Sequence, residues 1–581
     1  MIIFGYKSRA GSLNVVLNTE KEGEMLAEKY VKISYESYDD FIQNCKIQVP
    51  KDFNFAFDIV DKIADAQPNK KAIIWCNSKG EERVLTFSDI KRESNRTANF
   101  FKSFGIKKSD AVMVILKRHY EYWYCAIALH KLGALMVPAT HLLTVKDIKY
   151  RVKTAGIKTI VTASDKRITE IINEVKRDLP ELKNIISMRG YVNGLVECSK
   201  KIEKFSDVFE RPTGSEATKT YDKFLLYFTS GTTGMPKMVY HDFSYPLGHI
   251  ITARFWQNLD DDSLHLTVAD TGWAKASWGK LYGQWICGAC VFVYDYEKFN
   301  HHDLIEKISK YGVTSFCAPP TVYRYMIKED FSKYDLSKLK YVETAGEPLN
   351  PEVFYQFKKM TGLDIKEGFG QTETVVLAAT FPWMKVKPGS IGKPSAGWDL
   401  DIIDKENKSC KPGKEGHLIV KTKNCKPVGL FSGYYKDDAM TKTIWSNDIY
   451  DTGDVAYKDE DGYIWFIGRS DDVIKSSGYR IGPFEVENAL MEHSSVLECA
   501  ITGVPDDIRG SIVKATIVLA KGYNPSSGLV IELQNHVKKV TAPYKYPRII
   551  EFVKELPKTI SGKIKRKEIR EKGNKSGLEF I

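Results

Sequence analysis

The chain has 581 residues, of which 43% are hydrophobic and 27% charged, and its 85 Lys and Arg against 74 Asp and Glu give a formal net charge of +11. This length exceeds what one simple core needs, and the composition excludes a disordered or fibrous protein. The modest positive charge suits anionic small molecules such as nucleotides and does not by itself indicate nucleic-acid binding. No uncharged stretch reaches the ~18 residues that span a bilayer, so we expect no stable membrane anchor.

The N-terminal segment, residues 1–49, carries mixed charge with little periodicity, and we assign it as an extension. Its charges follow a very short apolar start, which is the wrong order for a secretory signal. The ten cysteines, scattered between Cys45 and Cys499, are typical of reduced intracellular thiols. We therefore expect a cytoplasmic protein, with organelle targeting as an alternative because no acid precedes Glu20.

Beyond the extension, helical patterns alternate with short apolar strands. An amphipathic helix is predicted after Asn54, a good N-cap, and Pro68 ends it. Further helices are predicted over residues 119–131, closed by Gly133, and from residue 147. The predicted strands are residues 111–116, 135–138, 159–162, 184–187, 224–228, 264–269, 289–294, 313–317 and 341–344. This alternation indicates parallel sheets covered on both faces, a doubly wound α/β architecture.

The pattern changes after Arg469, where a small α+β unit of roughly 110 residues begins. Its predicted elements are a helix opened by Pro483, strands 497–502 and 512–519, a helix near 530–540 and a strand near 549–553. The predicted domains are therefore an extension (1–49), a large domain (50–470) and a small C-terminal domain (471–581).

A loop of small residues follows the predicted strand 224–228. Residues 229–237 (TSGTTGMPK) can wrap backbone N–H groups and hydroxyls around phosphate oxygens, with Lys237 supplying positive charge. The spacing is not that of a Walker P-loop. Residues 368–370 are not a dinucleotide fingerprint either, because Glu373 stands where the third glycine is required. The sequence therefore predicts a phosphate-binding loop of another kind.

Seven motifs in order resemble the signatures of the adenylate-forming enzymes, which include acyl-CoA synthetases, luciferases and peptide-synthetase adenylation domains. They are residues 227–237 (YFTSGTTGMPK), 344–348 (TAGEP), 368–373 (GFGQTE), 450–454 (YDTGD), 468–472 (GRSDD), 477–482 (SGYRIG) and 557–563 (PKTISGK). Residues 53–56 (FNFA) and 270–273 (DTGW) most resemble the medium-chain acyl-CoA synthetases. The resemblance implies a large domain of doubly wound sheets with a distorted β-barrel subdomain, and a small mobile α+β C-terminal domain.

The resemblance also implies the reaction. A carboxylate attacks the α-phosphate of ATP, pyrophosphate leaves, and the thiol of coenzyme A captures the acyl-adenylate. Because the carboxylate is already ionised at neutral pH, the first step needs no general base. It needs relief of the repulsion between anions, which cations and backbone dipoles supply. The implied cofactor is Mg²⁺, and the implied partners are a small carboxylic acid, ATP and coenzyme A.

Roles are carried over from the family residue by residue. Lys563 is the implied adenylation lysine, Thr372 contacts the α-phosphate, and Glu373 holds magnesium. The remaining ATP- and AMP-binding residues are Thr229, Ser230, Gly231, Thr232, Thr233, Lys237, Gly346, Glu347, Pro348, Gly368, Phe369, Gly370, Gln371, Asp454 and Arg469. Most relatives have Tyr at position 369, so Phe369 keeps the stacking face and lacks a hydroxyl.

Thioester formation is implied for a second group of residues. Ser477, Gly478 and Arg480 would approach coenzyme A after the C-terminal domain rotates about a hinge at Asp471. Gly478 has no Cβ, which allows close approach to the thioester path.

The acid itself is less closely defined. Acetyl-CoA synthetases carry Trp where this chain has Gly370, so glycine predicts room for a longer acyl group. The predicted acyl pocket is lined by Trp273, Lys275, Trp278 and Gly370. Trp278 can block a channel, and Lys275 can bind a carboxylate, unless both side chains face other parts of the fold. We expect a short-to-medium, branched or aryl acid.

Three alternatives stay open at this point. The chain could load a carrier protein, act as a non-catalytic AMP or acyl-CoA sensor, or resemble a luciferase in more than its first half-reaction. Lys563 counts against the sensor, because a binding protein has no need of it. The sequence predicts no nucleic-acid partner, and a homo-oligomer is compatible with it.

Overall fold

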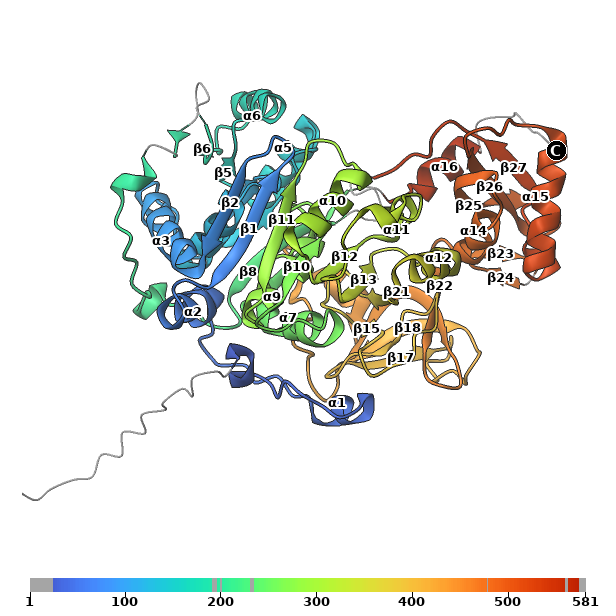
Figure 1. The fold of residues 1–581 in the computed structure, drawn as a ribbon, viewed down its shortest axis with the longest axis horizontal. Helices are drawn as coiled ribbons and strands as arrows, with labels where there is room; N and C mark the ends of the chain where they lie inside the picture. The colour runs from blue at the N-terminus through green and yellow to red at the C-terminus, as the bar shows by residue number, and fades with distance from the viewer. Residues whose placement is uncertain are drawn as a thin grey trace, which may run out of the picture.

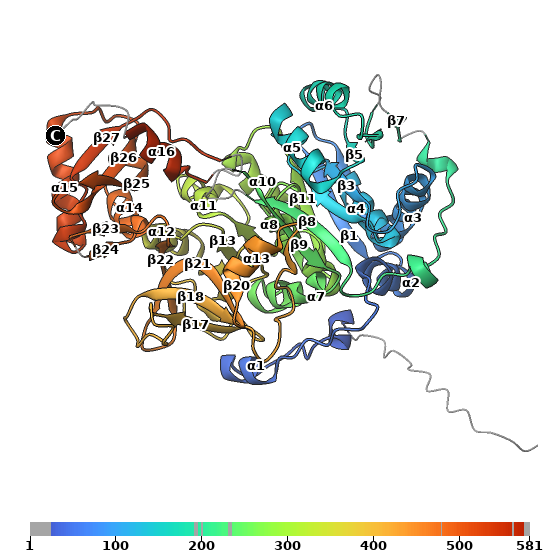
Figure 2. The same cartoon turned by 180° about the vertical axis from the view of Figure 1, so that it is seen from behind.

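The protein is described here by a computed structural model that covers residues 25–190, 196–198, 201–229, 235–477, 479–559 and 563–573, without the side chains of residues 480, 572 and 573. Two large sheets and a third, antiparallel sheet form most of the molecule (Figure 1). A smaller C-terminal unit stands to one side of them, and the view from behind agrees (Figure 2).

The first sheet has nine strands in the order β16-β15-β14-β13-β12-β10-β11-β1-β2. Pairing is parallel from β14 through to β1, whereas β2, β15 and β16 are antiparallel to their neighbours. The strands are β1 Lys71–Asn77, β2 Glu82–Thr86, β10 Leu264–Thr267, β11 Cys290–Asp295, β12 Ser315–Ala318, β13 Tyr341–Ala345, β14 Ile365–Phe369, β15 Ala378–Ala379 and β16 Lys393–Pro394.

The second sheet has eight strands in the order β19-β9-β8-β4-β3-β5-β6-β7. Its pairs are parallel from β8 to β7, and β9 returns antiparallel to β8. The strands are β3 Ala111–Ile115, β4 Leu135–Pro138, β5 Thr159–Thr162, β6 Asn184–Ser187, β7 Val196–Glu197, β8 Lys223–Thr229, β9 Lys237–Asp242 and β19 Gly433–Tyr434.

The third sheet is antiparallel and lies below the C-terminal unit in the view of Figure 1, beside β15 of the first sheet. Its strands are β17 Asp399–Ile403, β18 Gly416–Lys421, β20 Trp445–Ser446, β21 Ile449–Lys458 and β22 Ile464–Arg469. Strand β21 pairs with β18, β20 and β22, so it is the centre of this sheet.

Helices fill the connections, as parallel strands require. Those of the large domain are α1 Tyr38–Asn44, α2 Lys62–Ala66, α3 Phe87–Ser103, α4 Glu121–Leu132, α5 Val145–Ala155, α6 Lys166–Asp178, α7 Tyr245–Ile250, α8 Ala274–Gly279, α9 Tyr282–Ile286, α10 His301–Tyr311, α11 Pro320–Met326, α12 Pro351–Thr361 and α13 Asp438–Ile444. Gly133 ends α4 in the left-handed region (φ +66°), as its sequence position predicts. The helix predicted after Asn54 forms, but its first part, Ala56–Asp61, is π-helical.

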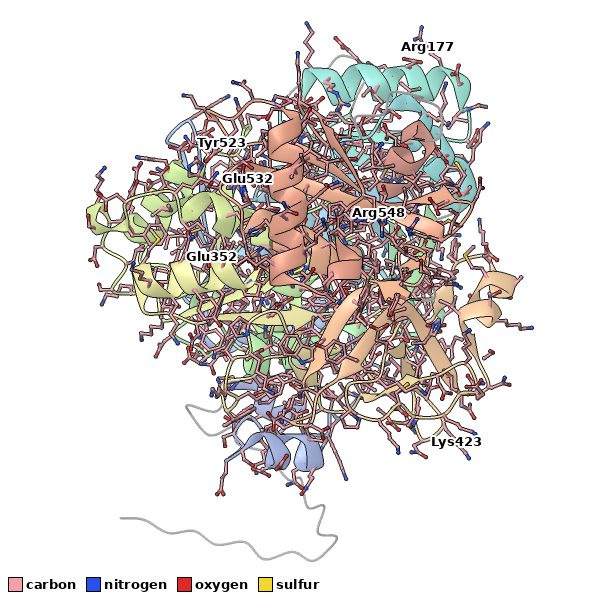
Figure 3. The ribbon with its side chains drawn as sticks, turned by 90° about the vertical axis from the view of Figure 1, so that its right-hand side faces the viewer. Arg177, Glu352, Lys423, Tyr523, Glu532 and Arg548 are labelled. Carbon is pink, nitrogen blue, oxygen red and sulfur yellow. The ribbon has the colours of Figure 1, made fainter. Side chains whose placement is uncertain are left out.

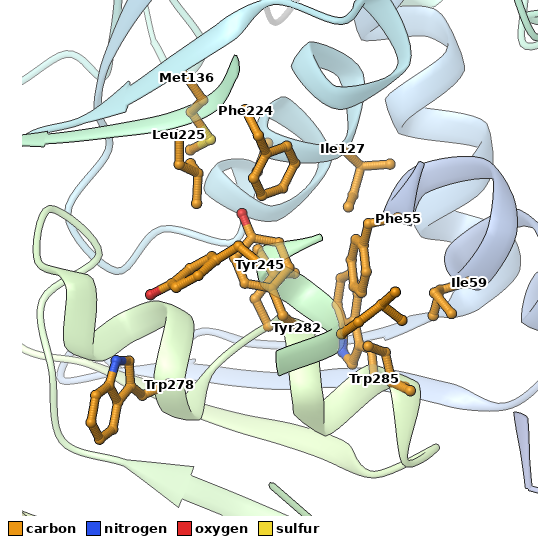
Figure 4. Packing of buried hydrophobic residues seen from close by; sticks show 14 of the residues in the cluster. Phe55, Ile59, Ile127, Met136, Phe224, Leu225, Tyr245, Trp278, Tyr282 and Trp285 are labelled. Atoms are coloured by element: carbon orange, nitrogen blue, oxygen red, sulfur yellow. The ribbon is translucent and has the colours of Figure 1, made fainter. Parts of the chain in front are cut away.

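Aromatic side chains join the two large sheets. Tyr282 of α9 packs edge-on to Phe55 and, at 5.5 Å between ring centroids, against Phe224 of β8 (Figure 4). Trp285 stacks on Phe55 and donates its indole N–H to the Ala72 carbonyl of β1. Each such ring is worth several times the ~0.8 kcal/mol of a buried methylene, so this cluster fixes the distance between the sheets.

The C-terminal unit has its own core of buried residues. Its elements are β23 Ile474–Ser476, β24 Tyr479–Ile481, α14 Pro483–Met491, β25 Val496–Asp506, β26 Gly510–Leu519, α15 Ser527–Val540, β27 Ile549–Phe552 and α16 Arg566–Gly573. A buried ion pair of 2.7 Å between Glu487 and Arg566 ties α14 to α16, and Arg570 pairs with Asp472 at 2.6 Å. Figure 3 shows α15 on the outer side of the unit, where Glu532 points away from the large domain.

Residues 25–49 pack against the large domain. Phe41 is fully buried and lies 4.8 Å from the ring of Phe255 and 5.0 Å from that of Phe381. The Trp383 indole donates to the Tyr35 carbonyl, and the Tyr38 hydroxyl to the Pro394 carbonyl. In the part of the chain that is described, no helix is both long and apolar enough to cross a membrane.

The predicted fold class is confirmed: a large α/β domain of doubly wound sheets precedes a small α+β unit. The predicted domain limits at residues 49 and 470 remain predictions.

Candidate active site

The predicted motifs lie at the carboxyl ends of strands from both large sheets. Strand β8 ends at Thr229, β13 at Ala345 and β14 at Phe369, each directly before or within a motif. Ligands of open parallel sheets bind beyond these ends. Ser230, Gly231, Thr232 and Thr233 lie outside the described residues. The third sheet adds Asp454 from β21 and Arg469 from β22.

Gln371 joins the first sheet to the third. Its amide nitrogen donates to the Asp454 carboxylate at 2.6 Å and to the Thr452 carbonyl at 2.8 Å, while its amide oxygen accepts from the Tyr450 hydroxyl at 2.7 Å. Arg469 donates to the other oxygen of Asp454 at 3.0 Å and to the Thr452 carbonyl at 2.9 Å. These charge-assisted bonds fix the Asp454 carboxylate in one orientation.

The Asp454 carboxyl is 3% exposed, and burial raises its pKa to about 6 although the Arg469 charge opposes that rise. At neutral pH it is a carboxylate held in a nearly dry site. Such a group accepts hydrogen bonds strongly, which is the chemistry that the two hydroxyls of a ribose require.

Glu373 and Lys237 face opposite parts of one tyrosine. The Tyr434 hydroxyl donates to the Glu373 carboxylate at 3.0 Å, and the Lys237 ammonium lies 5.2 Å from the centre of the Tyr434 ring. Burial raises the pKa of Tyr434, so its hydroxyl stays protonated and donates. Among the described residues, none forms an ion pair with Glu373 within 4.0 Å, although its charge helps to raise the pKa of the Arg469 guanidinium.

His241 positions Thr372. Its Nε2 lies 2.8 Å from the Thr372 carbonyl oxygen, and because a carbonyl only accepts, Nε2 carries the hydrogen. Burial lowers the pKa of His241 to about 4, so the ring is neutral. Tyr245 stacks on this imidazole at 3.9 Å. The sequence did not indicate His241 or Tyr434, because both reach the site only through contacts distant along the chain.

The predicted adenine loop follows β13. Gly346 takes a left-handed conformation (φ +103°), which favours glycine, and Pro348 follows Glu347. The Thr321 hydroxyl of α11 donates to the Glu347 carboxylate at 3.1 Å. Phe369 lies 5.9 Å from Phe466 of β22, so one of its contacts is with the third sheet.

The space beside Gly370 is filled. A Cβ at this position would lie 2.4 Å from the Trp278 ring, and a Cβ at Gly368 would lie 2.5 Å from Trp256. Trp278 is 7% exposed and packs edge-on against Trp256 at 6.3 Å. Gly370 therefore does not open a longer channel, contrary to the prediction from this position: its missing side chain admits an indole from α8 instead.

Lys275 and Trp273 lie at the start of α8, where Trp273 is the residue before the helix. The Lys275 ammonium donates to the Ala345 carbonyl at 2.8 Å, immediately before the adenine loop. Burial lowers its pKa, and the nearby charge of Lys563 lowers it further. Lys563 of the C-terminal unit therefore lies close enough to this part of the site to interact with it.

The other predicted C-terminal residues lie in and after the turn that follows β22. Asp471 is exposed in the turn between β22 and β23, and Ser477 is exposed before β24. Gly478 and the Arg480 side chain lie outside the described residues. Beside them, Tyr479 and Tyr544 stack at 4.1 Å although both are exposed, and Lys545 lies 5.6 Å from the Tyr544 ring.

Two family models match the chain. The model of the AMP-binding enzyme covers residues 60–435, and that of the AMP-binding enzyme C-terminal domain covers residues 485–563.

Individual relatives match over nearly the whole length. A mitochondrial acyl-coenzyme A synthetase of mouse, ACSM3, is 41% identical over 93% of this chain and 94% of its own. The mitochondrial acyl-coenzyme A synthetase ACSM4 of human is 41% identical over 91% and 92%. Among solved structures, an anthranilate CoA ligase in complex with anthranoyl-AMP is 29% identical with a TM-score of 0.82, over 90% of this chain and 98% of its own. An acyl-CoA synthetase of Brucella canis is 31% identical with a TM-score of 0.71, over 93% and 99%.

These relatives correct one prediction. The expected cytoplasmic location is wrong, because both of the curated synthetases named above are mitochondrial proteins. Scattered free thiols are compatible with any reducing compartment, so they do not distinguish the cytoplasm from an organelle.

The Asp454 carboxylate predicts a pH dependence of nucleoside binding. As pH falls through about 6, the carboxyl takes up a proton and can no longer accept at both oxygens. We expect the affinity for adenosine, which has no phosphate to titrate, to fall about tenfold between pH 7.5 and pH 5. Isothermal titration across this range measures it. His241, with a pKa of about 4, stays neutral throughout. In Asp454→Asn the affinity should be lower and independent of pH, and an unchanged slope in that variant would refute the role of Asp454.

Proposed function

The chain belongs to the AMP-binding enzyme family, and from this premise we propose the specific acid and mechanism of its reaction. It is an ATP-dependent, AMP-forming acyl-CoA synthetase, a ligase that joins a carboxylic acid to coenzyme A. The acid that we propose is short to medium in length, with branched and aryl acids included.

The first half-reaction is supported by one arrangement above all. Lys237 begins β9 directly after the phosphate loop, the Asp454–Arg469 pair comes from the third sheet, and the charge of Lys563 acts on Lys275, which is bonded to the end of β13. The substrate carboxylate and the phosphates of ATP are proposed to meet between these groups. Each ammonium offsets the repulsion between these anions, and no side chain has to remove a proton from a carboxylate that is already ionised. His241 and Gln371 hold the Thr372 and Asp454 groups in place before the substrate arrives.

Glu373 is the proposed magnesium ligand. Its carboxylate has one hydrogen bond, from Tyr434, and no ion pair with a described residue, and an oxygen donor of this kind suits a hard divalent cation. Bound magnesium would neutralise charge on the phosphates. The hydrogen bond from the Tyr434 hydroxyl fixes the orientation of the Glu373 carboxylate.

The second half-reaction is proposed to follow a rotation about Asp471. This rotation would withdraw Lys563 and bring Ser477, Gly478 and Arg480 to the site. The exposed stack of Tyr479 on Tyr544 would move with them. These two solvent-exposed rings suit the purine of coenzyme A, since aromatic faces stack on bases, whereas the neighbouring Lys545 ammonium is already paired with Glu485.

The acyl group is proposed to end at Trp278. The indole occupies the space beside Gly370 and is held by Trp256, and by His249 at 6.1 Å between ring centroids. Figure 4 shows Trp278 below Tyr245, with its ring edge away from the central aromatic cluster. A wall of this size favours short or branched chains and disfavours long straight ones.

Truncation of this wall should lengthen the preferred acid. In wild type we expect acyl-CoA formation to be greatest with C4–C8 or branched acids and small with palmitate. In Trp278→Ala we expect the ratio of kcat/KM for octanoate over butyrate to rise at least about tenfold, because each further methylene is worth ~0.8 kcal/mol when buried. Acyl-CoA is measured by mass spectrometry across a panel from acetate to palmitate, with 2-methylbutyrate, isobutyrate and benzoate included.

A matched control is Trp465→Ala, since Trp465 stacks on Tyr457 away from the pocket. It should leave the ratio unchanged. Equal use of palmitate and butyrate by wild type would refute the proposed acid. Pyrophosphate release without thioester on free coenzyme A would favour a carrier-protein loader instead.

The two half-reactions should respond to different substitutions. We expect Lys563→Ala to nearly abolish adenylate formation while thioester formation from preformed acyl-adenylate continues, because the lysine acts only on the first step. Gly478→Leu should do the reverse. Acid-dependent pyrophosphate exchange and single-turnover thioester formation measure the two steps separately. Equal damage to both steps in both variants would contradict the domain rotation.

A further inference from the structure

Helix α14 contacts the large domain at both of its ends. Near its start, Phe484 packs against Phe466 of β22 at 5.5 Å between ring centroids. At its end, the Met491 sulfur lies 3.2 Å from Nη1 of Arg324, which belongs to α11 of the large domain. In Figures 1 and 2 the C-terminal unit lies beside α11, α12 and β22, in agreement with these contacts.

The same Arg324 guanidinium also reaches the adenine loop. Its Nη2 donates to the Thr321 hydroxyl at 2.6 Å and lies 3.8 Å from the Glu347 carboxylate. Thr321 in turn donates to that carboxylate at 3.1 Å. Arg324 therefore connects the loop predicted to hold the adenine with the C-terminal helix nearest to it.

The two sides of this connection differ in strength. Thr321 accepts a hydrogen bond from the charged guanidinium and Glu347 attracts it by charge, and all three residues belong to the large domain. Met491 offers only a thioether, which is a weak acceptor on a flexible side chain. The contact between the domains is therefore the one that breaks first when the C-terminal unit moves.

The orientation in which this contact forms is the one that suits adenylation. The charge of Lys563 in the C-terminal unit lowers the pKa of Lys275, whose ammonium donates to the Ala345 carbonyl at the end of β13 at 2.8 Å. Ser477, by contrast, lies on a β23–β24 hairpin with an exposed side chain. A residue that stabilises this orientation favours the first half-reaction and has to be released for the second.

We propose that Arg324 is a positioning residue that holds the C-terminal unit in the adenylating orientation through Met491, and thereby couples the adenine loop to the position of Lys563. Arg324 touches none of the reacting atoms of the proposed mechanism. The inference rests on the proposed two-step function, because the contact between Arg324 and Met491 can affect the reaction only if the C-terminal unit rotates between the two steps.

The charge at position 491 tests this coupling. Met491→Glu places a carboxylate beside Arg324 and should strengthen the contact. We expect acid-dependent ATP–pyrophosphate exchange to stay at the wild-type rate, while single-turnover thioester formation from preformed acyl-adenylate slows about threefold, the effect of one half-exposed ion pair. Met491→Lys repels Arg324, so exchange should slow about threefold while thioester formation is kept.

Two controls separate coupling from a general effect of charge. Ile531→Glu introduces the same carboxylate on α15, where Ile531 is 59% exposed, and it should change neither step. Combining Arg324→Gln with Met491→Glu should remove the effect of Met491→Glu on the thioester step. Thermal unfolding of each variant checks that the fold is retained.

The inference is overturned if Met491→Glu and Met491→Lys change both steps in the same ratio, or if Arg324→Gln does not remove the effect of Met491→Glu. Failure of the proposed function is distinguishable, because wild type would then form no acyl-CoA at all.

Discussion

The hydrogen bonds of the Asp454 carboxylate hold the site together. Gln371 reaches it from the end of the first sheet and Arg469 from the third, so one buried charge fixes two sheets that the backbone connects only distantly. Removing a partner from a buried charge costs several kcal/mol. The carboxylate can remain ionised there only because both partners are in place, and Arg469 lies two residues before Asp471. The proposed nucleotide site therefore shares Arg469 with the segment that leads to the proposed hinge.

Close packing against glycines, and not hydrogen bonding, shapes the proposed pocket for the acid. Gly368 and Gly370 accept two indoles at distances that no Cβ permits, so the wall of the pocket comes from helices α8 and η5 (Ile251–Trp256) instead of from β14. Exchange of a glycine for a bulky residue here would displace Trp278 or Trp256. In the proposed mechanism, chain-length preference depends on residues far apart in the sequence, and the C-terminal unit acts through Lys563 and Arg324.

Much of the fold and part of the candidate site could be predicted from the sequence. Strands such as β3 and β12 are short apolar runs between helical patterns, and local motifs placed Asp454, Arg469 and Gln371 in one site. The strands of the third sheet could not be predicted from the sequence, because β20 has two residues and turns separate the longer strands. Residues 25–49 show little periodicity because several of the rings that bury Phe41, such as Phe255 and Phe381, lie more than 200 residues away along the chain. For the same reason the sequence could not indicate His241, Tyr434, Arg324 or the contact of Trp278 with Gly370.

Exchange of labelled pyrophosphate into ATP, with 2-methylbutyrate or hexanoate and magnesium but without coenzyme A, tests the central claim most directly. If an acyl-adenylate forms at the site that contains Asp454 and Arg469, the exchange should be rapid, should require the acid and should be lost in Lys563→Ala. Exchange that appears only after coenzyme A is added would contradict it, because the adenylate would then not be a separate intermediate and the two-step use of the C-terminal unit would have no basis.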